Sequence, residues 1–409
     1  MKERIFGSVR SAAIRLLSDD AKQLLRQRIA SWIDEDNIVT YHELASQENI
    51  PTWRFDQCRT CRFDEPEYYN ELPDQISNLI GHHEYHQPFV IEVPNVELVG
   101  RQGIKRTKDG RYIVFNFDQE ANRSAAMDLA LDFIEAVSYG TWPLATPSPV
   151  RPAAEIELAV PLLHRWAYNY SHWTEEWLTQ FEGLRYYCER TGKQPTIIVP
   201  PDPPSFVYES LATLGYDRED CIEWNHDRLQ VQQLVLPSIR RFRSDTSEDY
   251  VRMPSAIRWI RDTVLNSVDL PDPDDYPSKL LISREDADTR RIVNRDEVEQ
   301  ALSQLGFKTV VLTDYSFVEQ KQLFFHADVI VGTHGAGLTE LIYAPDAAVL
   351  ELFGSYMVPV YFEMAKGLEM PYGCLQCEAA GDDVLVDVEE LLEAVEFLLA
   401  VQQGDNQAV

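Results

Sequence analysis

A strand, a glycine-rich turn, a helix and a second strand follow one another between Ala327 and Phe353. The first run, Asp328–Val331, is rich in Val and Ile, which is typical of a buried parallel strand. The turn after it contains three glycines and His334, and a short helix is expected from Ala336 to just before Pro345. Such a turn directs backbone N–H groups and the positive end of a helix toward one place, where a phosphate is a suitable ligand. Glycine turns are also common packing devices, so the segment alone leaves both interpretations open.

The size and charge of the chain limit its class. Its 409 residues suffice for two domains, each with its own core. The formal net charge is −30, yet 44% of the residues are hydrophobic, which excludes a disordered composition. We therefore expect a protein adapted to high salt, with a halophilic archaeon as its source, because screening removes the self-repulsion. Nucleic acid is not expected as a partner, since its phosphate backbone would be repelled.

The sequence contains no apolar run of membrane-spanning length and no apolar block typical of a signal peptide, so we expect a cytoplasmic protein. Residues 1–31 run against the overall charge, with seven basic and three acidic residues. This segment is either a helix on the inner membrane surface or an ordinary packed N-terminal helix, and the second interpretation is favoured.

Four of the six cysteines form two C-x-x-C pairs, Cys58 with Cys61 and Cys374 with Cys377. A zinc or redox site is one interpretation of such pairs. The pairs lie far apart in the sequence, however, and the second falls in a predicted strand. Reduced structural cysteines are favoured, as is usual in the cytoplasm.

The first half of the chain is predicted in three parts. Residues 1–75 form a helical or irregular extension, and a β-meander covers Phe89–Phe117, with expected strands Val90–Val93, Val96–Val99 and Arg111–Phe115. The helix Ala121–Ser138 and a proline-rich linker come next. From Glu155 strands and helices alternate, which predicts a Rossmann-like domain over residues 76–268. Its expected strands are 156–160, 196–199 and 229–235, and its expected helices are 171–190, 205–214 and 254–266.

An acidic, proline-rich stretch, Asp269–Pro277, marks a predicted boundary. The alternation after it is cleaner and predicts a doubly wound parallel sheet over residues 269–409. Its expected strands are 279–283, 308–312, 328–331 and 349–352, and its expected helices are 295–305, 317–325, 336–343, 359–367 and 388–401. Two such domains are expected to face each other across a cleft, with ligands at the carboxyl ends of the strands.

Basic residues follow the strand 279–283. Arg284 comes directly after its last residue, Arg290 and Arg291 follow, and Asn294 precedes a helix. In so acidic a chain this grouping suggests an anion clamp. Pairing with the nearby Glu285, Asp286 and Asp288 is the alternative. Arg284 and the His334 turn, at the ends of two strands, could converge on one diphosphate.

A second group lies in the first alternating block, from Asn169 to Trp177. Ser171 is a plausible helix N-cap, and His172 and Glu176 are four residues apart, so they share one helix face. A histidine and a carboxylate at a strand end suit acid–base chemistry. A capped helix with a surface His–Glu pair is the alternative.

Together these segments resemble glycosyltransferase family 61. The resemblance spans about Val90–Cys377 and rests on three blocks: Asn169–Glu176, Ser283–Asn294, and Glu319–Gln320 followed by Gly332–Thr339. It implies a GT-B fold and an inverting, metal-independent transferase that moves a sugar from a nucleotide-sugar, expected to be a UDP-sugar, to a hydroxyl acceptor. The expected products are surface polysaccharides or glycoprotein glycans, made on a glycan, lipid-linked or protein acceptor.

The resemblance also implies residue roles. The C-terminal domain would bind the donor and the N-terminal domain the acceptor, with Glu176 as the catalytic base and His172 or Glu175 as its rivals. The implied donor-binding residues are Arg284, Arg290, Asn294, Gln320, Gly332, His334, Gly335, Ala336, Gly337, Leu338, Thr339 and Glu351.

Two positions depart from the family pattern, in which Asn often follows the Thr of the glycine turn and Glu often follows the Asn of the arginine block. This chain has Glu340 and Arg295 there. A carboxylate at position 340 would repel a phosphate, so it either points elsewhere or alters donor affinity. The alternative function for the whole chain is a non-catalytic nucleotide-sugar or anion-binding protein on the same fold.

Overall fold

The computed structural model describes residues 19–402 and 404, except 32, 34, 58, 115–122, 139–154, 226, 244–249, 271–275 and 403. The chain divides into two compact units. Unit 1 comprises residues 1–57 and 87–240, and unit 2 comprises residues 58–86 and 241–409. None of the helices in the described ranges is both long and apolar enough to span a bilayer. The predicted cleft between two domains stays a prediction.

This division differs from the expected boundary at residues 268 and 269. The helix α9 (Pro254–Leu265), expected as a connector, packs inside unit 2, where Pro254 lies against Gly367 and the Arg258 guanidinium donates to the Gly367 carbonyl at 2.6 Å. The expected extension over residues 1–75 also differs, because its described part supplies strands to the main sheets of both units.

Unit 1 is built on a mixed sheet, and among its described strands the order is β1-β8-β7-β6-β12-β9-β10-β11, with β2 beside β6. Its strands are β1 (Ile38–Thr40), β2 (Thr52–Arg54), β6 (Phe89–Val99), β7 (Ile104–Arg106), β8 (Tyr112–Val114), β9 (Glu155–Pro161), β10 (Thr196–Val199), β11 (Cys221–Glu223) and β12 (Arg228–Pro237). The strands β12, β9, β10 and β11 are parallel, whereas β6 pairs antiparallel with β2, β7 and β12. The antiparallel part agrees with the predicted β-meander, whose short turns join antiparallel strands, and it lies in one sheet with the parallel strands of the alternating block.

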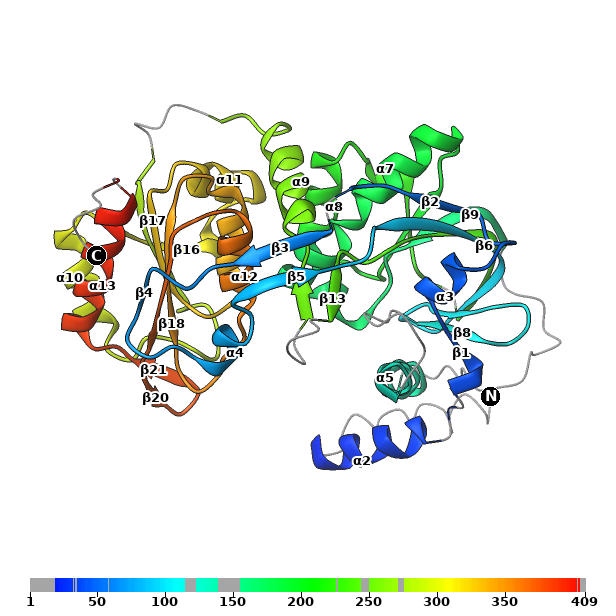
Figure 1. Ribbon diagram of the computed structural model, residues 1–409, viewed down its shortest axis with the longest axis horizontal. Coiled ribbons are helices and arrows are strands. Elements are labelled where there is room, and N and C mark those ends of the chain that lie inside the picture. Colours follow the sequence, from blue (N-terminus) through cyan, green and yellow to red (C-terminus); the bar gives the residue numbers. More distant parts are fainter. Residues whose placement is uncertain are drawn as a thin grey trace. The chain divides into compact units, whose positions relative to one another are not determined.

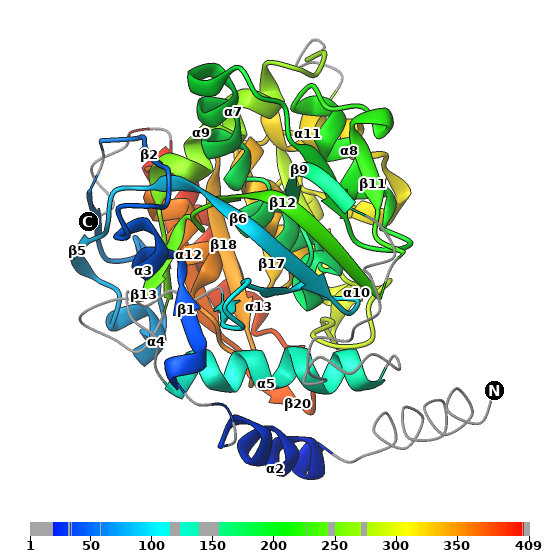
Figure 2. The same ribbon diagram turned by 90° about the vertical axis from the view of Figure 1, so that its right-hand side faces the viewer.

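The strand β6 corrects a second expectation. Two separate strands were expected around Pro94 and Asn95, but one strand of 11 residues runs through this point. Asn95 adopts a left-handed backbone conformation, with φ of 55°. The strand continues because β12 pairs with it on both sides of this residue, as Figure 2 shows for the two neighbouring strands.

The helices of unit 1 are α2 (Asp19–Ala30), α3 (Tyr41–Ala45), α5 (Arg123–Ser138), α6 (Tyr170–His172), α7 (Gln180–Thr191) and α8 (Ser205–Thr213). The helix expected over 171–190 is instead interrupted by a π-helical turn, Trp173–Trp177. Helix α5 lies beside α2 (Figure 2), and its Ala126, Leu129 and Phe133 join the core under β1 and β8. The described part of α5 agrees with the expected helix, while the expected linker lies outside the described residues.

Unit 2 contains a parallel sheet of the order β16-β15-β17-β18-β19-β4. Its strands are β15 (Lys279–Ser283), β16 (Lys308–Val311), β17 (Val329–Thr333), β18 (Ala348–Phe353), β19 (Tyr372–Gln376) and the edge strand β4 (Tyr68–Tyr69). The order of the first five strands is that of a flavodoxin-like, doubly wound sheet. The predicted strands and the parallel sheet are thus confirmed for this half.

Helices cover both faces of this sheet (Figure 1). Helices α10 (Arg295–Gln304) and α13 (Val388–Gln402) pack on one face, and α9, α11 (Phe317–Phe325) and α12 (Val360–Gly367) gather around the 3₁₀ helix Ala336–Tyr343 on the other. The remaining elements are β3 (Thr60–Phe63), α4 (Asp74–Ser77), β5 (Gly81–Glu84), β13 (Arg241–Arg243), β14 (Tyr250–Arg252), β20 (Glu378–Ala380) and β21 (Asp383–Leu385). The described chain is therefore a mixed α/β protein with parallel and antiparallel sheets.

Candidate functional site

The anion site predicted in unit 2 lies at the carboxyl ends of β15 and β17. These two strands are neighbours, but the chain leaves β15 toward β16 on its other side, so the strand order reverses between them. Ligands of doubly wound sheets bind at such a switch point. Arg284 follows β15 directly, and His334 and Gly335 follow β17.

The glycine turn is shaped by close contacts. A Cβ atom at Gly335 would overlap the Arg284 guanidinium, so only glycine lets the arginine lie against this turn. A Cβ at Gly337 would come within 2.9 Å of Leu312, and one at Gly332 within 3.1 Å of Leu338. The structure thus brings Arg284 and the turn together, as the sequence suggested.

His334 is held from one side by a buried carboxylate. Its Nδ1 lies 2.6 Å from Oε1 of Glu351, and Oε2 of Glu351 accepts a hydrogen bond of 2.6 Å from the Tyr372 hydroxyl. Burial and the Glu351 charge raise the pKa of Tyr372 well above its usual value, which keeps that hydroxyl a donor. Because Glu351 is an acceptor, the imidazole carries its proton on Nδ1, and Nε2 is the ring atom left for a ligand.

Arg290 is fixed by its backbone. It has a left-handed conformation, with φ of 61°, and its carbonyl accepts a 2.8 Å hydrogen bond from the Thr333 hydroxyl. Its guanidinium lies over the ring of Tyr356 at 5.0 Å, and the same ring lies 5.4 Å from the His334 ring. Arg290 therefore stands beside the turn that carries His334.

The positive charge of this group is not locally neutralised. Within the described ranges, neither Arg284 nor Arg290 forms an ion pair. Burial and the charge of Arg290 lower the pKa of Arg284 from its usual value. The alternative of local pairing is wrong for these two arginines, because Glu285 pairs with Arg295 instead. Two guanidiniums and an imidazole beside a helix N-terminus make a site for an anion with more than one charge.

A pocket of about 390 Å³ opens next to this group. Its floor is apolar, with Ile282 and Ile292, and its walls carry Arg284, Thr333 and Asp383. Its size lies at the lower end of the range for ligand pockets, about 300–1,000 Å³.

Three expected donor-binding residues contact other parts of the protein. The Asn294 side chain exchanges two hydrogen bonds with the backbone of Val386, at 2.8 and 3.0 Å. The Gln320 amide donates to the carbonyls of Leu312 and Tyr315, at 2.8 and 3.1 Å. Leu338 belongs to the buried core.

The carboxylate of Glu351 is fully buried and contacts His334 and Tyr372. Thr339 is fully buried, and its hydroxyl has no hydrogen-bond partner among the described residues. Ala336 is the half-buried first residue of the 3₁₀ helix. Sequence reasoning missed Tyr356 and the 382–386 segment, for which no local motif exists.

Glu340 and Arg295, the two residues that depart from the family pattern, each form ion pairs with other side chains. The carboxylate of Glu340 is fully buried and lies 2.9 Å from the equally buried ammonium of Lys321 on α11. It therefore points into the protein and away from the turn's ligand side. Arg295 forms ion pairs with Glu285 and Glu299, which are partly exposed.

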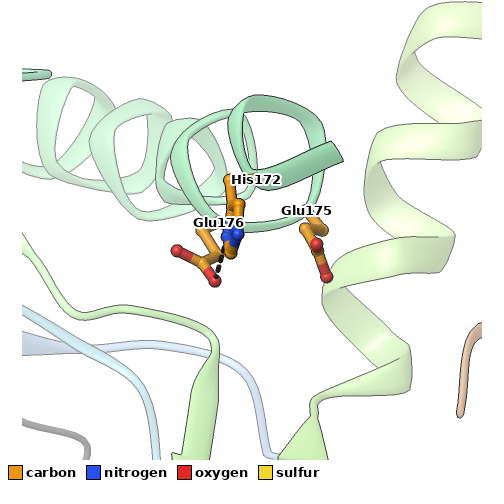
Figure 3. A group of neighbouring side chains, drawn as sticks. All are labelled: His172, Glu175 and Glu176. Atoms are coloured by element: carbon orange, nitrogen blue, oxygen red, sulfur yellow. Dashed lines mark hydrogen bonds and ion pairs between the residues drawn. The ribbon is translucent and has the colours of Figure 1, made fainter. Parts of the chain in front are cut away.

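The second candidate group lies in unit 1, after the carboxyl end of β9. This strand has parallel neighbours on both sides, β12 and β10, so the strand order also reverses here. Nδ1 of His172 lies 3.0 Å from Oε1 of Glu176, and Glu175 accepts a 3.0 Å hydrogen bond from the Ser171 hydroxyl. Figure 3 shows His172 and Glu176 turned toward each other, with Glu175 directed to the other side.

His172 and Glu176 differ in how much of each side chain is exposed to solvent. The Glu176 side chain is 4% exposed and that of His172 is 27% exposed. Glu176 therefore holds Nδ1, while Nε2 of His172 faces outward and has no hydrogen-bond partner among the described residues. A histidine oriented in this way by a carboxylate has the geometry that a general base needs. One ligand atom each from His172, Glu175 and Glu176 lies within 4.8 Å of the others, so these three could also hold a cation.

The cysteines form no comparable group in the described part of the chain, and Cys58 lies outside it. Cys61 lies on β3, and Cys374 is buried on β19. Burial raises the pKa values of Cys374 and Cys377 to about 12, which disfavours the thiolate that zinc requires.

Comparison with known proteins agrees with the sequence resemblance. Residues 170–350 match the sequence model of the family described as Glycosyltransferase 61. The EGF domain-specific O-linked N-acetylglucosamine transferase of Mus musculus is 33% identical over 100 residues, which are 23% of this chain and 19% of that protein. The protein of that name from Xenopus laevis is 37% identical over 83 residues, 19% of this chain and 16% of that protein.

A beta-1,2-xylosyltransferase of Oryza sativa subsp. japonica is 37% identical over 99 residues, 23% of this chain and 17% of that protein. These matches span less than a fifth of the length of each relative. The family match covers the His172–Glu176 group, the arginine loop and the glycine turn. Over residues 170–350, the chain is therefore similar to the glycosyltransferase 61 family.

Proposed function

We propose that this chain is an inverting glycosyltransferase that moves a sugar from a nucleotide-sugar to a hydroxyl of a glycan or protein acceptor. The family match over residues 170–350 and similar proteins named as N-acetylglucosamine and xylose transferases support this class of reaction. The observation that carries the proposal is the meeting of Arg284, Arg290 and His334 at the switch point of unit 2.

Unit 2 is assigned the donor, and we take the nucleotide to be uridine diphosphate. Transfer breaks the bond between the anomeric carbon and the diphosphate, which leaves with an additional negative charge. Arg284 and Arg290 would stabilise that charge without a metal ion, and His334, when it carries a proton on Nε2 as well as on Nδ1, would donate from Nε2 to a phosphate oxygen. The guanidiniums are held in place before the reaction, so little reorganisation is needed.

Unit 1 is assigned the base. Nε2 of His172 would take the proton of the acceptor hydroxyl as its oxygen attacks the anomeric carbon, and Glu176 would stabilise the imidazolium that forms. A single displacement of this kind inverts the anomeric configuration. Glu176 is then a positioning residue, and His172 is the catalytic base.

Thermal stabilisation by nucleotide diphosphates in molar salt tests the donor assignment. A ligand at about 100 times its Kd stabilises the native state by about 2.7 kcal/mol, so a melting shift with UDP and without added metal is expected. The shift should be lost in Arg284→Ala. Arg62→Ala is the matched control, because Arg62 is an exposed arginine of the same unit paired with Asp64. A shift that survives in Arg284→Ala would refute the site.

The base is tested by transfer kinetics with the same donor. His172→Ala should lower kcat by about 10²–10⁴-fold, the usual contribution of a general base, while the UDP melting shift stays unchanged. Glu176→Gln should lower kcat less and change the pH profile. Unchanged turnover in His172→Ala would reject the assignment.

A further inference from the structure

We propose that Trp166 is the platform on which the acceptor binds, and that the acceptor presents a neutral pyranose ring to it. The proposal rests on the proposed transferase function and deepens it, because it names the chemical class of the acceptor. Its basis is an exposed indole that stacks directly on the imidazole assigned as the base.

Trp166 is placed by the same strand end that places the base. It lies in the 3₁₀ turn Arg165–Tyr168, which follows β9, and its backbone N–H donates to Nδ1 of His164 at 3.3 Å. Trp166 is nevertheless 45% exposed. Among the described residues, no group accepts a hydrogen bond from its indole N–H, so that donor is available to a ligand.

The indole and the imidazole are stacked, so the exposed part of Trp166 borders the proposed base. The ring centroids of Trp166 and His172 are 5.0 Å apart, and the ring planes make an angle of 26°. A sugar bound to the exposed part of the indole would therefore lie next to His172. Arg165 also approaches the indole, at 5.9 Å, but its guanidinium is tied to Asp132 at 2.7 Å.

The chemistry of this surface favours a sugar over other hydroxyl acceptors. A pyranose ring has a flat C–H face that can pack on an aromatic ring, and hydroxyls that can accept a hydrogen bond. Tryptophan offers the matching groups, an apolar ring face and an indole N–H at the ring edge. A serine or threonine side chain has no such face. The net charge of −30 disfavours a phosphorylated or otherwise anionic acceptor.

Acceptor kinetics separate a platform from a residue that only positions the base. The donor is a UDP-sugar that the wild type turns over, and the acceptors are methyl glycosides of xylose, glucose, galactose, mannose and N-acetylglucosamine. Trp166→Ala should raise the acceptor KM at least tenfold and leave donor hydrolysis by water within twofold. Trp166→Phe should restore most of the KM.

Tyr69→Ala, which removes an exposed aromatic ring from unit 2, is the matched control and should leave the KM unchanged. An unchanged KM in Trp166→Ala would overturn the proposal. So would a parallel loss of donor hydrolysis, because that result would make Trp166 a support for His172 alone.

A binding measurement keeps this proposal separate from the proposed function. Saturation-transfer difference NMR should show contact between the aromatic protons of the wild type and a methyl glycoside, and the signal should fall in Trp166→Ala but not in Tyr69→Ala. Contact without turnover of any nucleotide-sugar would support the platform and count against the transferase. Absence of contact with all five glycosides would overturn the platform.

Discussion

At the scale of single residues, Glu340 shows how a charge can look functional in sequence and be structural in the fold. Its carboxylate and the Lys321 ammonium are both fully buried, and the ammonium also lies 3.6 Å from the centre of the Phe317 ring. A buried charge is tolerated only when it is paired, so the two residues depend on each other. The pair joins α11 to the 3₁₀ helix that begins at the glycine turn.

Breaking this pair should destabilise the protein without improving donor binding. Glu340→Asn introduces the residue common in the family but leaves Lys321 buried without that carboxylate, which costs about 3–5 kcal/mol in comparable cases. Urea denaturation measures this loss. The double variant Lys321→Met/Glu340→Leu should recover most of it, since an apolar replacement of both partners removes the uncompensated charge. Equal stability of Glu340→Asn and the wild type would contradict the buried pair.

Cys374 on β19 and Cys377 just after this strand should react slowly with thiol reagents. A pKa of about 12 leaves about one thiolate in 10⁴ at pH 8 for Cys374 and Cys377. Because burial raises the folded-state pKa, the labelling rate should rise about tenfold per pH unit above pH 8 while the protein stays folded. Mass spectrometry after timed labelling measures it, with denatured protein as the control. Rapid labelling of Cys374 in the folded protein would refute the assignment.

The sequence predicted those features of the site that depend on residues close together in the chain or at the ends of strands. We predicted that Arg284 and the glycine turn lie close together because each follows the end of a strand. The structure confirms this contact. The role of Gln320 did not follow, because its amide bonds to backbone carbonyls that no side-chain motif reveals. The choice between Glu176 and His172 needed exposure, which sequence spacing does not contain.

At the scale of elements, the loop that carries Arg290 is held by a segment 92 residues further along the chain. Arg290 donates its N–H to the Asp382 carbonyl at 2.8 Å, and Arg291 pairs with the Asp383 carboxylate at 2.9 Å. Val293 and Val384 add a backbone hydrogen bond of 2.8 Å. These hydrogen bonds and this ion pair hold Arg290 in its left-handed backbone conformation. Without such contacts that conformation costs free energy.

Removing the ion pair between Arg291 and Asp383 should weaken donor binding without unfolding the protein. Asp383→Ala removes the acceptor of Arg291, and we expect a several-fold weaker UDP affinity by calorimetric titration. Asp64→Ala removes the partner of another exposed arginine in the same unit and is the control. Unchanged affinity in Asp383→Ala would show that the backbone hydrogen bonds suffice.

The ion pair between Arg291 and Asp383 also determines the pH range in which Asp383 supports donor binding. Hydrogen bonds and the charge of Arg291 lower the pKa of Asp383 below its usual value of 3.8. A lowered folded-state pKa means that the contribution is present above the unfolded value and is lost only as the pH falls through the folded one. The effect of Asp383→Ala should therefore be constant from pH 8 to pH 5.

Elements were predictable where strand and helix alternate regularly. In unit 2 each apolar run is one buried strand, and the expected strands match those observed. In unit 1, Pro94 and Asn95 looked like a turn, but pairing with β12 carries the strand through them. Long-range pairing overrode the local signal there.

At the scale of the whole molecule, the chain passes between its two units three times. Residues 58–86 leave the N-terminal segment and supply the edge strand β4 to the parallel sheet of unit 2. Asn70 ties this strand to the carbonyl and N–H of Gln376, at 3.1 and 2.8 Å. No composition shift marks this excursion, so the boundaries predicted from linker-like stretches differ from the observed division.

The net charge of −30 is the property that acts on both units together. At 0.1 M salt the screening length is about 10 Å, so acidic groups repel one another across much of the surface, and at 1 M it is about 3 Å. Repulsion favours the expanded, unfolded chain. The melting temperature at pH 7.5 should therefore rise by several degrees between 0.1 and 1 M KCl, as measured by calorimetry.

A second pH separates charge screening from the general effect of salt on apolar burial. At pH 5.5 the chain is closer to its isoelectric point of about 4.6, and carboxylates that begin to take up protons reduce the repulsion. The salt-induced increase should then be smaller than at pH 7.5, whereas a salting-out effect on hydrophobic contacts would be nearly the same at both values. An equal increase at both pH values would mean that the acidic surface contributes little to salt dependence, and the expectation of adaptation to high salt would lose its physical basis.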